Sequence, residues 1–196
     1  MKASTVLFYV ALGATSARAL PAEAVDHVAN VGNVDVGEAG LAIDRVQGGL
    51  EARDNLPGLD ALQSKYARGI IAQAKTDMVG AHGCQAGIAT ALTESSLVMY
   101  ANKAVPASMK LPHDRVGSDH DSVGLFQQRA SIYKSVQCDM DAACSAGQFF
   151  AEMRRVKGWQ TMAVGALCQR VQRSAYPDRY NKFVPTATKA CKAGGL

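Results

Sequence analysis

The sequence has one long apolar run, at its N-terminus, and no later stretch that matches it. This run covers residues 6–14, follows Lys2, and precedes the small residues Ala17 and Ala19. It has about ten residues, whereas a membrane-spanning helix needs about 20. A positive start, a short apolar centre and small residues in that order predict a secretory signal over residues 1–19. We therefore expect a secreted, extracellular protein and exclude a membrane as its partner.

The next segment, residues 20–53, lacks cysteine and aromatic residues and is poor in basic side chains. It carries six acidic side chains against two basic ones. A segment with weak apolar content and net negative charge cannot bury a core of its own, so we expect a flexible leader or pro-segment over residues 20–55. The tripeptide at residues 51–53, Glu-Ala-Arg, suits a processing site. The alternative is a linker that is never cut.

The remaining chain is basic as a whole, but its basic residues are not clustered. Residues 54–196 contain 17 Lys and Arg against 11 Asp and Glu. An excess of about six positive charges favours an anionic partner such as a bacterial wall, through an attraction that salt weakens. Because the positive residues are scattered and no nucleic-acid motif is present, we exclude nucleic acid as a partner. About 140 residues form one domain with a full core, which we place at residues 56–196.

All five cysteines lie in this domain, and none of them shows the close Cys-Cys or Cys-His spacing of a zinc site. In an exported chain, disulfides are the default. Two bridges can be chosen among five thiols in fifteen ways, so the spacing alone leaves the connectivity open. We favour Cys138 with Cys144, which closes a short loop, and Cys84 with Cys191, which would tie the chain end to the core. Cys168 lies in an apolar run and is expected to be a free, buried thiol.

The longer periodic segments predict helices. Apolar residues recur at spacings of three and four over residues 58–78, which indicates an amphipathic helix. The segment 85–97 is apolar on most sides, so we expect it to be the central buried helix. Further helices are predicted over residues 141–156, begun by a capping Asp139 or Asp141, over residues 161–173, and as a last turn opened by Pro177.

Only one short segment, residues 123–129, predicts an extended conformation. It follows residues 98–122, where two prolines and several polar residues indicate a long irregular surface loop. Loops of this length in compact domains are usually functional. The expected fold class is therefore α+β and mostly helical, with a central buried helix and a small strand region.

Glu94 is the only acidic residue between Asp77 and Asp114, and it lies near the end of the apolar central helix. A carboxyl group in such surroundings loses solvation, which favours the protonated form that a general acid needs. The alternative reading is an ordinary glutamate exposed at a helix end.

Three short segments stand in order along the chain, and the first of them holds Glu94. They are Thr93-Glu94-Ser95-Ser96, Gly124-Leu125-Phe126-Gln127-Gln128 and Gln172-Arg173-Ser174-Ala175-Tyr176-Pro177. These segments resemble the signature segments of one superfamily, the goose-type lysozymes and lytic transglycosylases. The form is similar to the lysozyme-like domains of actinobacteria and their phages, and the resemblance covers residues 62–185. It implies a lysozyme-like fold.

The resemblance implies that Glu94 protonates the glycosidic oxygen. Ser95 would position the substrate or the Glu94 side chain, and its alternative role is a hydroxyl that bonds to its own helix backbone. Tyr176 would place its hydroxyl near Glu94 and its ring against a sugar. The alternative for Tyr176 is a core aromatic residue that docks the C-terminal helix.

The middle segment would line the substrate groove. By the resemblance, Gly124 lets a sugar approach the backbone, while Gln127 and Gln128 offer donors and acceptors to sugar or acetamide groups. The other reading of this segment is a plain buried strand, and we accept that reading for Leu125 and Phe126.

Inverting hydrolysis also needs a second carboxylate, about 6.5 to 9.5 Å from the acid, to activate water. Asp119 and Asp121 precede the middle segment and are the candidates, with Asp121 ranked first. If neither reaches the site, attack by a hydroxyl of the substrate itself would give a lytic transglycosylase product. Against that outcome, Pro177 and Asp178 follow Tyr176 where lytic transglycosylases carry Asn and Gly.

No metal or cofactor is expected, because the spacing of His113, His120 and the neighbouring aspartates matches no metal site. The sequence therefore predicts a monomeric enzyme, a muramidase that cleaves the β-1,4 bond between N-acetylmuramic acid and N-acetylglucosamine in peptidoglycan. The alternatives are a lytic transglycosylase with the same fold, and a non-catalytic wall- or chitin-binding protein.

Overall fold

The structure is a computed structural model, and it describes residues 54–176 and 178–196. All of these residues belong to one compact unit, Gln47–Leu196. The predicted signal at residues 1–19 and nearly all of the predicted leader lie outside the described residues. So does Pro177, which was expected to open the last helical turn.

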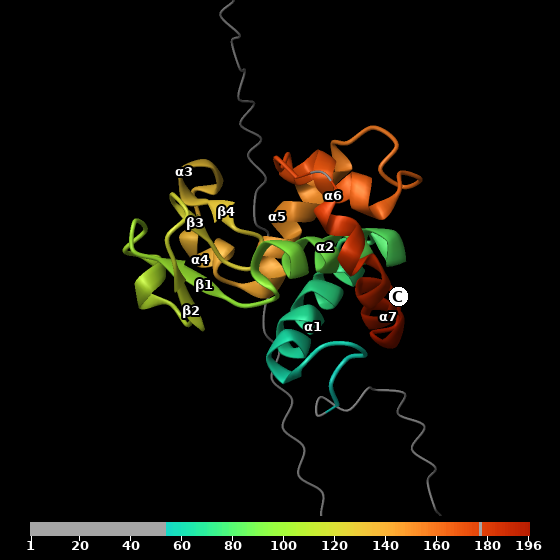
Figure 1. Cartoon of the computed structure of the whole chain (residues 1–196), viewed down its shortest axis with the longest axis horizontal. Helices are drawn as coiled ribbons and strands as arrows, with labels where there is room; N and C mark the ends of the chain where they lie inside the picture. The colour runs from blue at the N-terminus through green and yellow to red at the C-terminus, as the bar shows by residue number, and fades with distance from the viewer. Residues whose placement is uncertain (1–53, 177) are drawn as a thin grey trace, which may run out of the picture. The chain divides into compact units, whose positions relative to one another are not determined.

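The described chain is mostly helical with a small amount of strand, as the sequence predicts (Figure 1). None of its helices is both long and apolar enough to cross a membrane. The longer helices are α1 (Ala61–Thr76), α2 (Gly80–Ser95), α5 (Ala142–Arg154), α6 (Val164–Gln172) and α7 (Val184–Ala193). The short helical elements are α3 (Ala130–Tyr133), α4 (Val136–Asp139), and the 3₁₀ helices η1 (Ser108–Lys110) and η2 (Arg179–Phe183).

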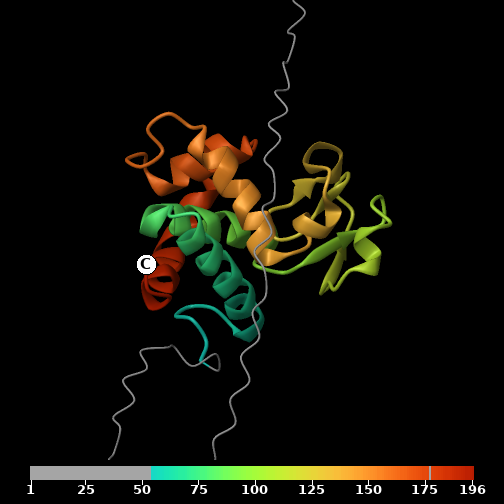
Figure 2. The same cartoon turned by 180° about the vertical axis from the view of Figure 1, so that it is seen from behind.

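Four short strands lie together, apart from the long helices, in both views of the molecule (Figures 1 and 2). Strands β1 (Tyr100–Asn102) and β2 (Arg115–Gly117) pair in parallel, whereas β3 (Ser122–Val123) and β4 (Gln128–Arg129) pair antiparallel. We call residues 98–140 the strand region, and α1, α2, α5, α6, η2 and α7 the helical region.

Helix α2 is the central helix of the helical region, and α1, α5, α6, η2 and α7 all pack against it. Ten of its 16 residues are buried, which confirms the prediction of a central buried helix. Small residues make this close packing possible. A Cβ added at Gly87 would lie 3.0 Å from the ring of Phe150 and 3.1 Å from the side chain of Ile70.

The helix ends follow local signals in the sequence. Asp60 caps α1 in a capping box with Gln63, and the Asp141 side chain accepts a hydrogen bond from the backbone of Cys144 at the start of α5. Of the two aspartates proposed to cap this helix, Asp141 is therefore the cap. Helix α2 begins five residues before the predicted start, at Gly80, and ends at Ser96 in a left-handed conformation.

The disulfides are the two that the sequence analysis favoured. Cys84 in α2 is bonded to Cys191 in α7, and Cys138 in α4 is bonded to Cys144 in α5. Cys168 is free and buried, as expected. The first bridge ties the C-terminal helix to the central helix, so η2, which lies just before α7, is held close to α2.

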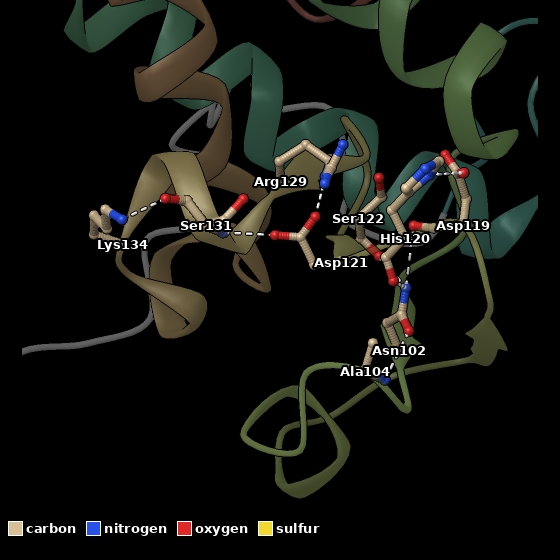
Figure 3. Close-up of polar contacts among 9 residues, drawn as sticks. All are labelled: Asn102, Ala104, Asp119, His120, Asp121, Ser122, Arg129, Ser131 and Lys134. Atoms are coloured by element: carbon tan, nitrogen blue, oxygen red, sulfur yellow. Dashed lines mark hydrogen bonds and ion pairs between the residues drawn. The ribbon is translucent and has the colours of Figure 1, made fainter.

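The loop expected at residues 98–122 is more ordered than predicted, because it contains β1, η1 and β2. The buried side chain of Asn102 holds the second half of this loop in place. The Asn102 side-chain amide donates to the backbone oxygens of Asp119, His120 and Ser122, over 3.1 to 3.3 Å (Figure 3). One side-chain amide therefore fixes the turn that carries both candidate aspartates.

The single extended segment predicted over residues 123–129 is wrong. The chain forms β3, turns over residues 124–127, and returns as β4. Gly124 and Gln127 have positive φ values of 76° and 50°, which break the extended conformation.

Candidate functional site

The side chain of Glu94 projects from the last turn of α2, where only 15% of its surface is exposed. Two side chains of η2 hold its carboxylate. The Tyr180 hydroxyl donates to Oε1 over 2.5 Å, and the Arg179 guanidinium forms an ion pair with Oε2. Both oxygens of Glu94 are thus engaged by one short element that is about 85 residues away in sequence.

Arg179 is itself held in a tight environment. Its guanidinium lies 3.5 Å from the Thr93 backbone oxygen and 5.4 Å from the centre of the Tyr180 ring. Its Nε atom is buried and has no hydrogen-bond partner among the described residues. The apolar surroundings expected for Glu94 from the sequence are therefore wrong, because a full positive charge touches the carboxylate.

Tyr180 is fully buried. Burial, together with the hydrogen bond to Glu94, raises the pKa of the Tyr180 hydroxyl well above its usual value. The phenol therefore keeps its proton near neutral pH, where it donates to Glu94.

The structure assigns this hydroxyl contact to Tyr180 and not to Tyr176. Tyr176 is 71% exposed and forms no hydrogen bond with Glu94 among the described residues, so it is also not the core aromatic of the alternative reading. From the sequence, Tyr180 belongs only to the predicted last helical turn. Nothing in its spacing singled it out, because the contact with Glu94 joins two distant segments.

Ser95 connects the central helix to the turn between β3 and β4. Its buried hydroxyl lies 3.0 Å from the Ala91 backbone oxygen and 2.8 Å from the Leu125 backbone oxygen. The contact with Ala91 is the bond to its own helix backbone that was the alternative role of Ser95. The contact with Leu125 joins two segments that are distant in the sequence. Ser95 is thus a residue that positions the chain beside Glu94.

Gly124 is required for a different reason than the one expected. A Cβ at this position would lie 2.0 Å from the backbone oxygen of Asp139, so the close approach is between two backbone segments rather than between backbone and sugar. The positive φ of Gly124 also favours glycine. Gln127 closes the same turn, since its amide donates to the Gly124 oxygen over 2.9 Å.

The rest of the middle segment faces the core. Leu125 and Phe126 are buried, as accepted from the sequence, and the Phe126 ring stacks on Phe149 with ring centres 5.2 Å apart. Gln128 is also buried, and its amide donates to the Ser145 backbone oxygen in α5 over 3.2 Å. Its Oε1 atom has no partner among the described residues.

The three segments of the resemblance meet at this turn. Ser95 bonds to the Leu125 oxygen, and the Gln172 amide lies 3.5 Å from the Phe126 oxygen. The first segment carries Glu94, while the third ends two residues before η2. Two hydrogen bonds therefore link Ser95 and Gln172, which lie far apart in the sequence, to one short turn.

A pocket of about 560 Å³ opens beside this turn, between β4, α3, α5 and α6. Glu94 does not line it, although Ser95 links Glu94 to the segment that does. The lining residues come from both regions of the molecule. They are Gln127, Gln128, Arg129, Ile132, Tyr133, Gln148, Ala151, Glu152, Val171, Gln172 and Arg173.

Asp121, the first candidate for the second carboxylate, is engaged at both oxygens. One oxygen forms an ion pair with Arg129, and the other accepts from the Ser131 backbone N–H over 2.7 Å (Figure 3). The hydrogen bonds from Ser131 and Arg129 lower the pKa of Asp121 well below its usual range. This bonding ties the start of α3 to β3, which is a structural role.

Asp119, the second candidate, has a more exposed carboxylate with fewer partners than that of Asp121. Its side chain is 73% exposed, and one oxygen lies 2.7 Å from Nδ1 of His120 (Figure 3). Among the described residues, no hydrogen bond or ion pair joins Asp119 or Asp121 to Glu94. The role of either aspartate as a catalytic base therefore stays a prediction.

Asp139 is a buried carboxyl group that the sequence analysis considered only as a helix cap. It is 0% exposed, and neither of its oxygens has a hydrogen bond of normal geometry among the described residues. Burial raises the pKa of Asp139 to about 6, and the side chain of Gln148 offsets only part of this effect. Its backbone oxygen is the atom that Gly124 approaches, so it lies directly behind the β3–β4 turn.

Within residues 54–176 and 178–196, no three or more His, Cys, Asp or Glu side chains gather in a way that could hold a metal ion. No protein-family model matches the chain, and no curated protein is significantly similar to it. The arguments for its function therefore come from the site itself.

Proposed function

We propose that this protein is a secreted peptidoglycan glycoside hydrolase, a muramidase with a lysozyme-like fold, and that Glu94 is its catalytic acid. The observation that carries the proposal is the setting of Glu94. Its carboxylate is mostly buried at the end of the central helix, it is held at both oxygens, and it is linked through Ser95 to a turn that lines a pocket.

This setting suits proton transfer to a glycosidic oxygen. A general acid must be fixed within hydrogen-bond reach of the atom that it protonates, and Tyr180 and Arg179 hold the Glu94 side chain in one orientation. Within the proposal, Arg179 orients Glu94 and stabilises the carboxylate that remains after the proton has left.

The bonding of Asp121 gives weight to a second candidate function, a lytic transglycosylase. An inverting hydrolase needs a second carboxylate that is free to activate water. Asp121 has neither oxygen free, which leaves Asp119 as the candidate with an open oxygen. If Asp119 does not act as a base, the C6 hydroxyl of the muramic acid residue would attack instead and give a 1,6-anhydro product.

Product analysis separates these functions. We would digest purified peptidoglycan with the wild-type chain and with Glu94→Gln, and identify the new glycan ends by mass spectrometry. The muramidase proposal predicts reducing N-acetylmuramic acid ends from the wild type and none from Glu94→Gln. New 1,6-anhydro ends would assign the transglycosylase reaction instead.

A binding assay on the same walls tests the non-catalytic alternative. If neither protein releases glycan fragments but both sediment with the walls, the chain is a wall-binding protein and the catalytic proposal is rejected. A Glu94→Gln variant that cleaves as fast as the wild type would reject Glu94 as the acid.

A further inference from the structure

Two arginines, Arg129 and Arg173, are among the residues that line the pocket beside the β3–β4 turn. They come from different regions of the molecule. Arg129 ends β4 and precedes α3, whereas Arg173 ends α6. Two cationic residues at one pocket of about 560 Å³ are suited to binding an anionic group.

Arg129 is only partly neutralised by its neighbour. Its Nε atom forms the ion pair with Asp121, and 43% of its side chain is exposed. Its two terminal nitrogens have no hydrogen-bond partner among the described residues. Because Asp121 is fixed from its other side by Ser131, it holds the Arg129 side chain in place while those nitrogens stay available.

Arg173 is not neutralised by any ion pair within the described chain, and it is exposed. Its backbone is in the left-handed conformation with φ of 56°, which ends α6 at this residue. The preceding residue, Gln172, holds this helix end against the turn through the Phe126 oxygen. The position of Arg173 at the pocket is thus fixed by the fold.

The remaining charged residue of the lining is acidic and is paired with a neighbouring arginine. Glu152 is the acidic lining residue, and its carboxylate accepts a hydrogen bond from Arg155 over 2.8 Å. The other polar lining groups include the amides of Gln127 and Gln172, beside Ile132, which is 67% exposed. Amides next to an exposed apolar side chain suit the hydroxyl, acetamide and C–H groups of an amino sugar.

From this arrangement we infer that the pocket binds an acidic amino-sugar ligand, with Arg173 and the terminal nitrogens of Arg129 binding its carboxylate. The inference rests on the proposed function, since peptidoglycan is the glycan of this kind. Binding of this kind makes the protein selective for glycan that carries carboxylates over neutral chitin. The carboxylate is on the lactyl group or on the attached peptide.

Calorimetric binding tests this inference without turnover, in the full chain carrying Glu94→Gln. Three ligands are compared. They are the N-acetylglucosaminyl-N-acetylmuramic acid disaccharide with its lactyl carboxylate free, the same disaccharide carrying an L-Ala-D-Glu dipeptide, and neutral di-N-acetylchitobiose. We expect at least one acidic ligand to bind about tenfold tighter than chitobiose, which is the effect of one charge-assisted contact. The ligand that gains more identifies which carboxylate is bound.

The variant Arg173→Gln should remove most of this preference while leaving chitobiose binding unchanged. Arg170→Gln is the matched control, because Arg170 is also an exposed arginine of α6 but does not line the pocket. Equal affinity for all three ligands would overturn the inference. An equal loss in Arg173→Gln and Arg170→Gln would also overturn it, because only the total charge would then matter.

The two proposals fail separately. If the wild type cleaves peptidoglycan but Arg173→Gln binds every ligand as the parent does, the pocket inference alone is wrong. If no cleavage occurs but binding of the acidic disaccharides depends on Arg173, the hydrolase proposal is wrong and the pocket inference stands.

Discussion

The helical region and the strand region each hold a carboxylate with an arginine, but they do so in different ways. Glu94 receives two side-chain donors from η2, which lies 85 and 86 residues further along the chain. Asp121 receives one side-chain and one backbone donor from residues eight and ten positions away. The disulfides differ likewise, with separations of 107 residues for Cys84–Cys191 and six for Cys138–Cys144.

This difference underlies the roles that we propose for the two carboxylates. Backbone donors from a neighbouring segment fix a turn, and they change only if the turn itself unfolds. Side-chain donors from a distant element orient a group without making it part of the local backbone structure. We therefore expect Glu94 to take part in the proposed chemistry and Asp121 to hold the turn.

The strongest test of the comparison is a pair of isosteric variants. Glu94→Gln should reduce glycan cleavage by about 10²- to 10⁴-fold, the range for loss of a general acid. Asp121→Asn should keep cleavage within about threefold and slightly lower the stability, because Arg129 and the Ser131 backbone N–H lose their charged acceptor. Turnover on purified walls and urea unfolding measure the two effects.

The opposite pattern would break the comparison. If Asp121→Asn stops cleavage while its unfolding curve matches that of the wild type, Asp121 is the second carboxylate of an inverting enzyme. The product ends should then be reducing ends.

The disulfides extend the comparison to stability. In the chain-entropy account, a bridge that closes a long loop restricts the unfolded state more than one that closes a short loop. Replacing Cys84 and Cys191 by alanine should cost about 5 kcal/mol, and replacing Cys138 and Cys144 about 2 kcal/mol. Denaturant unfolding under non-reducing conditions measures both. Equal losses would show that the bridge from α2 to α7 does not control the stability of the helical region.

Variants of two tyrosines compare the residue that contacts Glu94 in the structure with the residue that the resemblance assigned to that contact. Tyr180→Phe removes the hydrogen bond to Glu94 and should lower kcat by about 10-fold or more, with KM nearly unchanged, since a hydrogen bond to a charged group contributes about 1.5–3 kcal/mol. Tyr176→Phe, at an exposed position, should change kcat by less than about twofold. A larger effect of Tyr176→Phe would restore the role that the resemblance implied for Tyr176.

Asp139 gives the smallest expected effect, and the size of this effect depends on pH. Because burial raises the pKa of Asp139 to about 6 from 3.8, the charged form is disfavoured in the folded state. The wild type should then lose stability as the pH rises from about 4 to above 6, by about 1–3 kcal/mol. Asp139→Asn should be more stable than the wild type at pH 8 and similar to it below pH 4.

Unfolding of both proteins in urea at pH 3.5, 5, 6.5 and 8 checks this dependence. Asp178→Asn, at an exposed position, is the control and should follow the wild type at every pH. If Asp139→Asn is less stable than the wild type at pH 8, the carboxylate has a partner that stabilises its charge.

Much of the helical region could be predicted from the sequence because its signals are local. Apolar spacing placed α1, α5 and α6 within a few residues of their observed ends, and capping by Asp141 was among the expected options. The two favoured disulfides were chosen from chain-level arguments about loop closure and the chain end. The turn at residues 124–127 was missed because its apolar residues resemble those of a buried strand.

The sequence by itself determined which segment becomes the central helix and that Glu94 lies near its end, because helical periodicity is encoded in neighbouring residues. Only the tertiary structure decided what surrounds that carboxylate. Arg179 and Tyr180 reach Glu94 because α7 is bonded to α2 and brings η2 with it, and Gly124 is needed because the Asp139 backbone passes next to it. Such contacts depend on how distant elements pack, and no spacing along one chain segment records them.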